Sequence, residues 1–167
     1  MKVITEEYRK LQQELHQNPN YGVASLQFAP IVANIIKDLN VESLSDYGAG
    51  KQNLLKGLTE LGIKLKIYQP YDPAFPEYGE PKAADLVCCI DVLEHIENPN
   101  QFFKEVQRVL NNRGHICIRT PNQWNYIALA AAFIPNKYHS IVTSIVQDGR
   151  HNKDVFPTFY KCNSVSR

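Results

Sequence analysis

The chain has 167 residues, of which 44% are hydrophobic, and its formal net charge is +1. This length fits one globular domain, and the near-neutral charge excludes an overall field that would favour nucleic acid or an anionic membrane. No apolar run reaches the ~20 residues that span a bilayer, and the polar N-terminus lacks the apolar stretch of a signal peptide. We therefore expect a soluble, cytoplasmic protein with neither a membrane nor a nucleic-acid partner.

Helical and strand patterns alternate along the chain, which predicts an α/β domain with a parallel sheet. The first helix is expected to be capped by Thr5, and the second helix is expected to carry Pro30 in its first turn. Later helices are expected at 54–61 and from Asn98-Pro99, and then at 124–133 and 137–146. The expected strands are 41–45, 64–68, 85–91 and 115–119, with a turn at 111–114 before the last. We predict a single domain over 1–167, divided into N-terminal helices (1–40), a core (41–120) and substrate-side helices with a tail (121–167).

The strongest single feature is Asp46-Tyr47-Gly48-Ala49-Gly50, between a predicted strand and a leucine-faced helix. Glycines here let the backbone turn sharply and approach a ligand closely, and the following helix offers unpaired N–H groups. The plain alternative is a tight turn in which glycine only relieves strain.

Two further acidic positions weaken that alternative. Asp72 stands at the end of the next predicted strand, where doubly wound folds use a carboxylate to accept bonds from a ribose diol. Asp91-Val92-Leu93-Glu94-His95-Ile96 follows the most apolar strand, and open α/β sheets bind ligands at the carboxyl ends of their strands. Taken alone, Asp72 could be a solvated edge carboxylate, and 91–95 a polar helix cap.

These motifs together resemble class I S-adenosylmethionine-dependent methyltransferases, of the kind called type 11 or 23. Asp46 to Gly50 is similar to their D-x-G-x-G motif, and 84–87 with 91–95 is similar to their DLV…DVLEH stretch. Residues 112–118 and Thr120-Pro121-Asn122 are similar to the turn, strand and T-P-N that follow. The resemblance covers roughly residues 20–160, with the motifs in the family's order.

The resemblance implies a Rossmann-like, doubly wound and mostly parallel sheet with helices on both faces, and S-adenosyl-L-methionine as cofactor. It places Gly48, Ala49 and Gly50 beside the methionine part, Asp46 near its amino end and Asp72 on the ribose. Asp91 would lie beside the sulfonium and the substrate entrance. Tyr47 and Val92 would also line the cofactor site, and Tyr21-Gly22 would cover it from the N-terminal side.

The chain departs from the family pattern in three ways. The family usually places a helix, a strand and an acidic residue near adenine between its second and fourth strands. Only residues 73–84 are available for this unit here, so the sheet should have a shortened centre in which the unit is shortened or absent. Gln52 replaces a third glycine. The sequence also ends before two further strands, so the chain looks truncated at its C-terminus. An open edge at 115–119 would then favour self-association into a homo-oligomer, or folding of the 156–160 tail across the strand.

The predicted reaction is methyl transfer to a small-molecule acceptor, catalysed mainly by positioning. Asp91 and His95 are the candidate catalytic residues, since histidine suits proton transfer near neutrality. At a helix start, however, a histidine is more often structural.

No C-x-x-C pair or nucleophile–base pair indicates a metal or a covalent intermediate, and we expect the cysteines to be buried, reduced thiols. The alternative is a non-catalytic binding or interaction protein with the same fold. A nicotinamide-dependent enzyme is disfavoured because G-x-G-x-x-G is absent.

Overall fold

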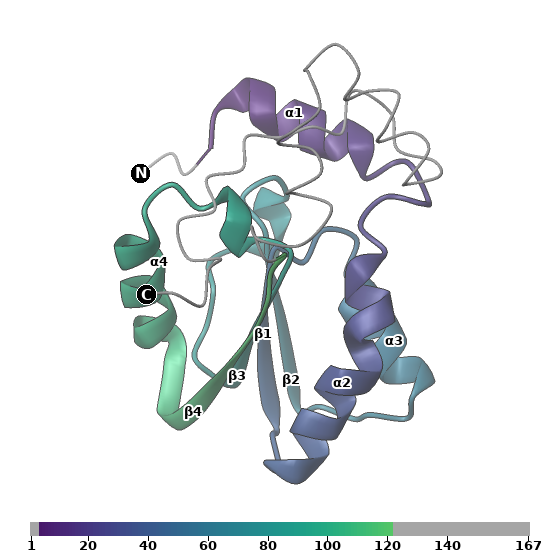
Figure 1. Cartoon of the computed structure of the whole chain (residues 1–167), viewed down its shortest axis with the longest axis vertical. Helices are drawn as coiled ribbons and strands as arrows, with labels where there is room; N and C mark the ends of the chain where they lie inside the picture. Colours follow the sequence, from purple (N-terminus) through teal and green to yellow (C-terminus); the bar gives the residue numbers. More distant parts are fainter. Residues whose placement is uncertain (1–3, 122–167) are drawn as a thin grey trace, which may run out of the picture.

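The computed structural model describes residues 4–121, which form a four-stranded parallel sheet flanked by helices (Figure 1). The strands are β1 (Ser43–Tyr47), β2 (Ile67–Tyr71), β3 (Ala84–Ile90) and β4 (Leu110–Arg119), in the order β2-β1-β3-β4. The helices are α1 (Glu6–Leu15), α2 (Ala24–Asp38), α3 (Asn53–Glu60) and α4 (Pro99–Val109), with short 3-10 turns η1 (Pro76–Tyr78) and η2 (Leu93–His95). The predicted parallel α/β sheet is confirmed. The helices predicted at 124–133 and 137–146 lie outside the described residues.

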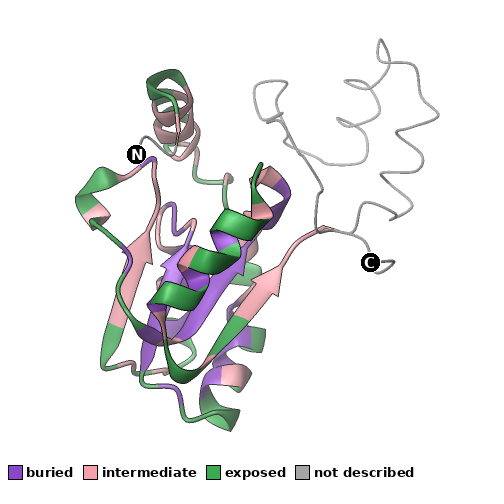
Figure 2. Ribbon diagram, turned by 90° about the vertical axis from the view of Figure 1, so that its left-hand side faces the viewer, coloured by how far each residue is buried: buried purple, intermediate pink, exposed green. Residues whose placement is uncertain are grey.

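Helices cover both faces of this sheet, as a doubly wound fold requires. One apolar cluster joins α2 and α3 to one face, and it includes Val32, Leu54 and Leu86. A second joins α4 to the other face, through Val87 and Phe102. The central strands β1 and β3 are buried almost throughout, whereas the outer strands are only partly covered (Figure 2). Continuous apolar runs such as that of β3 are typical of strands covered on both sides.

The second helix starts earlier than the sequence indicated. Pro30 was expected in its first turn, but α2 begins at Ala24 and contains Pro30 in its interior. A proline there removes one helical hydrogen bond. Burial of the α2 face that carries Ala29, Val32 and Ile36 outweighs this loss, because that face packs closely on α3 at Gly57.

The first two strands both lie further along the chain than predicted. β1 was expected at 41–45 and β2 at 64–68, yet they occupy 43–47 and 67–71. Asp46 and Tyr47 therefore belong to a central strand and pair with β2 and β3 on either side. Pro70, which lacks an N–H, is accommodated because β2 is an edge strand of the described sheet.

The chain passes from α4 directly into β4. The predicted turn at 111–114 is a bulge within β4, between the pairs Ala84–Leu110 and Leu86–His115. Asn98 caps α4 with Pro99 in its first turn, as predicted, and Phe103 on this helix is 41% exposed. The shortened centre is confirmed, since only η1 lies between β2 and β3.

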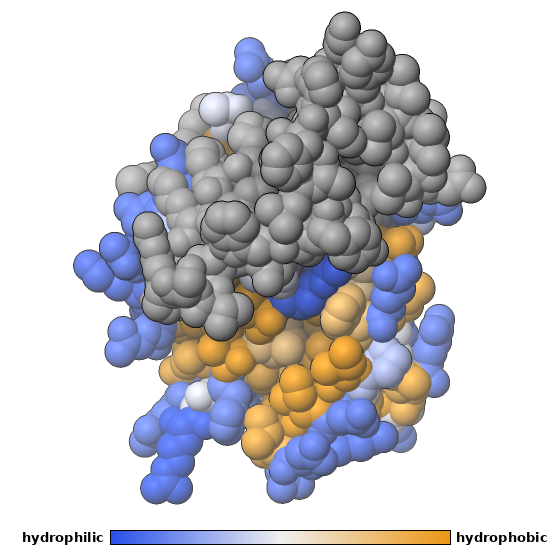
Figure 3. Space-filling view, in the orientation of Figure 1, coloured by the Kyte–Doolittle hydropathy of each residue, from blue (hydrophilic) through white to orange (hydrophobic). Residues whose placement is uncertain are grey.

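Apolar side chains gather between α2 and the free side of β4 (Figure 3). Ile31 and Ile116 are 53% and 39% exposed, and β4 is an outer strand in the part of the chain that the structure describes. Pairing of two copies along this edge remains a prediction.

Within 4–121, no helix is long and apolar enough to cross a membrane. Of the cysteines in this range, Cys88, Cys89 and Cys117 are free thiols, and the first two are buried.

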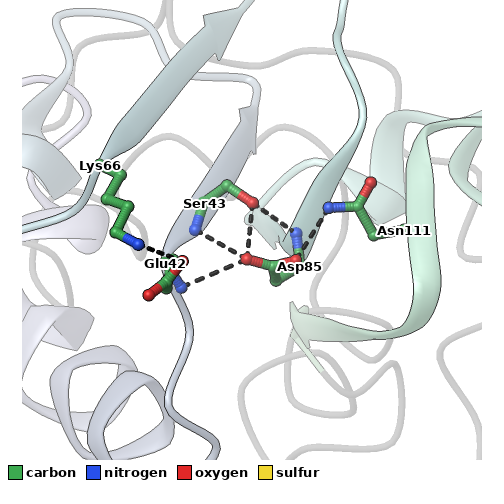
Figure 4. Close-up of polar contacts among 5 residues, drawn as sticks. All are labelled: Glu42, Ser43, Lys66, Asp85 and Asn111. Atoms are coloured by element: carbon green, nitrogen blue, oxygen red, sulfur yellow. Dashed lines mark hydrogen bonds and ion pairs between the residues drawn. The ribbon is translucent and has the colours of Figure 1, made fainter.

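At the amino ends of the strands, the Asp85 carboxylate links β1, β3 and β4 (Figure 4). One of its oxygens accepts from the Ser43 hydroxyl at 2.7 Å and from the Ser43 and Glu42 amides at 3.0 and 3.3 Å. The other accepts from the Asn111 side chain at 2.8 Å. These bonds favour the charged form and hold the pKa of Asp85 below its usual value.

Replacing this carboxylate should destabilise the fold in a pH-dependent way. We expect Asp85→Asn to lower the free energy of unfolding by about 1 kcal/mol at neutral pH, since solvent screens a partly exposed group. Because the folded pKa is depressed, the stabilisation exists above the ordinary aspartate value and is lost as the pH falls through the folded pKa. Urea unfolding of both proteins between pH 7 and pH 3 measures the difference.

Glu105→Gln is the matched control, because Glu105 pairs with Arg108 on the exposed surface of α4. That substitution should cost about 0.5 kcal/mol or less. Equal effects at the two positions would contradict a structural role for the Asp85 cluster.

Candidate functional site

The connection from β1 to α3 forms a tight glycine loop, residues 48–52. Gly48 and Gly50 have φ of +76° and +47°, and Gln52 also has a left-handed backbone with φ of +57°. The amides of Gly48 and Ala49 both donate to the Tyr71 carbonyl, at 2.8 and 3.2 Å. The loop therefore rests on the carboxyl end of β2.

Asp72 continues this attachment one residue further. Its Oδ2 accepts from the Gly50 amide at 3.0 Å, and its Oδ1 accepts from the Ala74 amide at 2.8 Å. Burial raises the pKa of Asp72 despite these two bonds. An ionised carboxylate has about four acceptor positions, so each oxygen can accept one more bond. The structure thus places Asp72 beside the glycine loop, at the strand end where it was predicted.

Asp46 and Tyr47 do not line the surface of the loop. Asp46 is 2% exposed and accepts from the Tyr68 hydroxyl at 2.5 Å, and burial raises its pKa to about 7. Tyr47 points to the opposite side of the sheet, where its ring contacts those of Tyr71 and Phe102. Both side chains support the strand from inside, and their contact with a cofactor remains a prediction.

The segment after β3 closes on the same loop. A Cβ on Gly48 would collide with Cγ2 of Val92, so these two residues are in close contact. Asp91 has a φ of +55°, and it forms an ion pair with Arg119 at the end of β4. Glu94 is buried and accepts from the Thr120 hydroxyl at 3.0 Å. The half-buried His95 ends η2, so 91–95 lies at the sheet edge where the sequence predicted it.

The connection between α1 and α2 covers the glycine loop from the N-terminal side. A Cβ on Gly50 would collide with the imidazole of His16, which packs edge-on between the rings of Tyr21 and Phe75. Burial, and then the charge of Lys51, lower the pKa of His16 to about 4, so this imidazole is neutral at pH 7.

Hydrogen bonds hold this cover in place. Lys51 donates to the Asn18 carbonyl at 2.7 Å, and Asn53 donates to the Gly22 carbonyl at 2.8 Å. Gln13 of α1 donates to the Ala74 carbonyl at 2.8 Å. The predicted cover at Tyr21-Gly22 is therefore brought against the loop, as part of a longer segment that begins in α1.

Sequence reasoning missed several residues of this site. His16, Tyr68 and Tyr78 carried no signal, because each acts through a partner distant in sequence; the Tyr78 hydroxyl, for example, donates to the Gly50 carbonyl at 2.7 Å. Arg119 could have been found, since it is the last residue of a strand at the binding edge of the sheet.

The hydrogen-bonding groups of the glycine loop and Asp72 suit a ligand with a hydroxylated ribose better than a phosphate. A phosphate would need free loop amides, yet those of residues 48–50 already donate to Tyr71 and Asp72. Asp72 retains acceptor capacity for hydroxyl groups. The residues of the site therefore fit an uncharged ribose. No group of three or more metal-ligating side chains occurs within residues 4–121.

A parallel sheet with a glycine loop after its first strand and an acidic residue after its second defines a Rossmann-like cofactor-binding domain. Residues 11–158 match the family model described as a methyltransferase domain. The chain belongs to this methyltransferase family, which confirms the resemblance found in the sequence and, with it, the expected cofactor, S-adenosylmethionine.

The individual proteins that resemble this chain share less than a third of their residues with it over the matched regions. The mitochondrial ubiquinone biosynthesis O-methyltransferase of Dictyostelium discoideum is 31% identical over 137 residues, covering 71% of this chain and 41% of the relative. The chain thus spans about two fifths of that protein's length.

Among solved structures, the plantazolicin methyltransferases BpumL and BamL are similar, each in complex with a desmethylPZN analogue and SAH. BpumL has a TM-score of 0.49 at 15% identity, covering 79% of this chain and 60% of that one. BamL has a TM-score of 0.43 at 13% identity, covering 70% and 53%.

The contact between Gly48 and Val92 predicts that adding a single methyl group at position 48 lowers the stability of the fold unusually strongly. Gly62, just after α3, also has a left-handed backbone, with a φ of +73°, but nothing lies within 4 Å of the place a Cβ would take. Gly62→Ala should therefore cost only the left-handed backbone energy, about 1–2 kcal/mol. Gly48→Ala should lower the free energy of unfolding by about 1–3 kcal/mol more, through overpacking. Denaturant titration of both variants measures this difference.

A double variant tests whether Val92 is the cause. Val92→Ala should cost less in the Gly48→Ala background than in the wild type, because it removes the clashing methyl. Independent, additive effects would show that Val92 is not what requires glycine at position 48.

Proposed function

We propose that this chain binds S-adenosylmethionine across the carboxyl ends of β1, β2 and β3 and transfers its methyl group to a small-molecule acceptor. The observation that carries the proposal is the position of Asp72, which holds the glycine loop while keeping acceptor capacity for hydroxyl groups. Family membership supports the class of reaction.

The chain's own residues would act mainly by positioning. Asp72 accepts bonds from the two ribose hydroxyls, and the glycine loop lets the backbone approach the methionine part. His16 and Val92, which close over Gly50 and Gly48, exclude water from the loop. When bound, the cofactor supplies a methyl group on a positively charged sulfur. Holding two reactants in line can then supply much of the rate enhancement.

Asp91 and His95 are the residues that we propose for the substrate side. Both follow β3, on the segment that contacts the glycine loop through Val92. His95 would accept the acceptor's proton as a general base. The Dictyostelium relative is by its name an O-methyltransferase, so an oxygen acceptor is the first class to test here.

The most direct prediction concerns binding of the demethylated product, S-adenosylhomocysteine. Calorimetric titration of the purified chain should detect binding, and NAD should bind far more weakly. Asp72→Ala should weaken binding by roughly 1.5–3 kcal/mol for each lost charged hydrogen bond, and Asp72→Asn should fall in between. The reason is that the carboxylate would bond both the loop and the ribose.

Asp38→Asn is the control, because Asp38 is an exposed carboxylate at the end of α2. It should leave the affinity unchanged. A folded Asp72→Ala variant that binds as tightly as the wild type would place the ribose elsewhere. If the folded wild type shows no binding at millimolar ligand, the proposed function is wrong.

A further inference from the structure

Asp91 and Arg119 are joined by both backbone and side chain at the carboxyl ends of β3 and β4. The Asp91 amide donates to the Arg119 carbonyl at 2.9 Å, while the Arg119 guanidinium donates to the Asp91 carboxylate. Asp91 adopts a left-handed backbone, with a φ of +55°, which non-glycine residues rarely occupy. These two bonds, one donated by Asp91 and one donated by Arg119, hold Asp91 in this conformation, so the direction of its carboxylate depends on Arg119.

A third element fixes the guanidinium. Its central carbon lies 4.7 Å from the centroid of the Phe28 ring, which belongs to α2. A guanidinium over an aromatic face is attracted to the ring, which favours this position of the side chain. The side chains of Arg119 and Asp91 are 36% and 29% exposed, so the pair is partly shielded from solvent. It thus links β3, β4 and α2 at the edge of the sheet where the glycine loop lies.

The pair is also next to the proposed cofactor site in sequence and in space. Val92, the residue after Asp91, contacts Gly48. The neighbouring carboxylate Glu94 is buried against Thr120, and burial raises its pKa, which favours the neutral form. Asp91 is therefore the more exposed of the two carboxylates within residues 91–95, and Arg119 is the cation paired with it.

We propose that Arg119 is a positioning residue that fixes Asp91 and offsets its charge, and so sets how strongly the site prefers the sulfonium cofactor over its neutral demethylated product. This inference rests on the proposed function. S-adenosylmethionine and S-adenosylhomocysteine differ by a methyl group and one positive charge, so the ratio of their affinities reports the electrostatic environment of the sulfur. A merely structural role of Arg119 would change both affinities alike.

The test is calorimetric titration of both ligands against wild type, Arg119→Gln, Arg119→Lys and Asp91→Asn. Arg119→Gln leaves the Asp91 charge uncompensated, so the affinity ratio should move toward S-adenosylmethionine by about three- to fivefold, the size of interactions between partly exposed charges. Asp91→Asn should move the ratio by a similar factor in the opposite direction. Arg119→Lys keeps the charge and should stay within about twofold of wild type.

Arg108→Gln is the matched control. Arg108 forms an equivalent pair with Glu105 on α4, away from the site, so this variant should leave the ratio unchanged. If Arg119→Gln does not fold, Phe28→Leu removes the ring that holds the guanidinium, and it should shift the ratio in the same direction by a smaller factor. Product binding with an unchanged ratio in the folded variants would overturn this inference alone. Absence of product binding by the wild type would overturn the proposed function as well.

Discussion

The site depends on the attachment of the glycine loop to the carboxyl end of β2. The Tyr71 carbonyl accepts the amides of Gly48 and Ala49, and the Asp72 carboxylate accepts that of Gly50. Three consecutive N–H groups that could have bound an anion are thereby used inside the protein. The Asp72 carboxylate can still accept further hydrogen bonds at this position. This remaining capacity decides the kind of ligand that the site can hold. Hydroxyl groups suit it, whereas phosphates do not.

Two close contacts complete the loop from either side. His16 lies over Gly50 from the N-terminal segment, and Val92 lies over Gly48 from the segment after β3. Neither glycine could carry a side chain without moving these neighbours. The glycines thus serve packing within the protein as much as the approach of a ligand. The imidazole of His16 is neutral at pH 7, which lowers the cost of burying it, while its Nδ1 has no hydrogen-bond partner among the described residues.

Much of this architecture could be predicted from the sequence, because the features concerned are local. The Asn98-Pro99 start of α4, the buried run of β3 and the glycine loop each have a short-range signature. The predicted boundaries of α2 and β1 were wrong because tertiary packing overrides the local conformational preference of the residues there. Pro30 lies inside α2 because its apolar face packs on α3, and β1 extends through Asp46 because it pairs on both sides.

The roles of individual site residues were harder to predict for the same reason. The motif places Asp46 near the cofactor, and that contact stays a prediction, but the motif carries no sign that this carboxylate is buried against Tyr68, a partner on the neighbouring strand. His16 and Arg119 act through residues more than twenty positions away in the chain. Contacts of this kind depend on the sheet order, and the spacing of residues in the sequence does not contain them.

A crystal structure of the full chain with S-adenosylhomocysteine tests directly whether Asp72 holds the ribose. We predict that both ribose hydroxyls lie within hydrogen-bond distance of the Asp72 carboxylate, while the Gly50 amide still donates to that carboxylate. A ribose bound away from Asp72, or a loop amide that leaves Asp72 to bind the ligand, would contradict it.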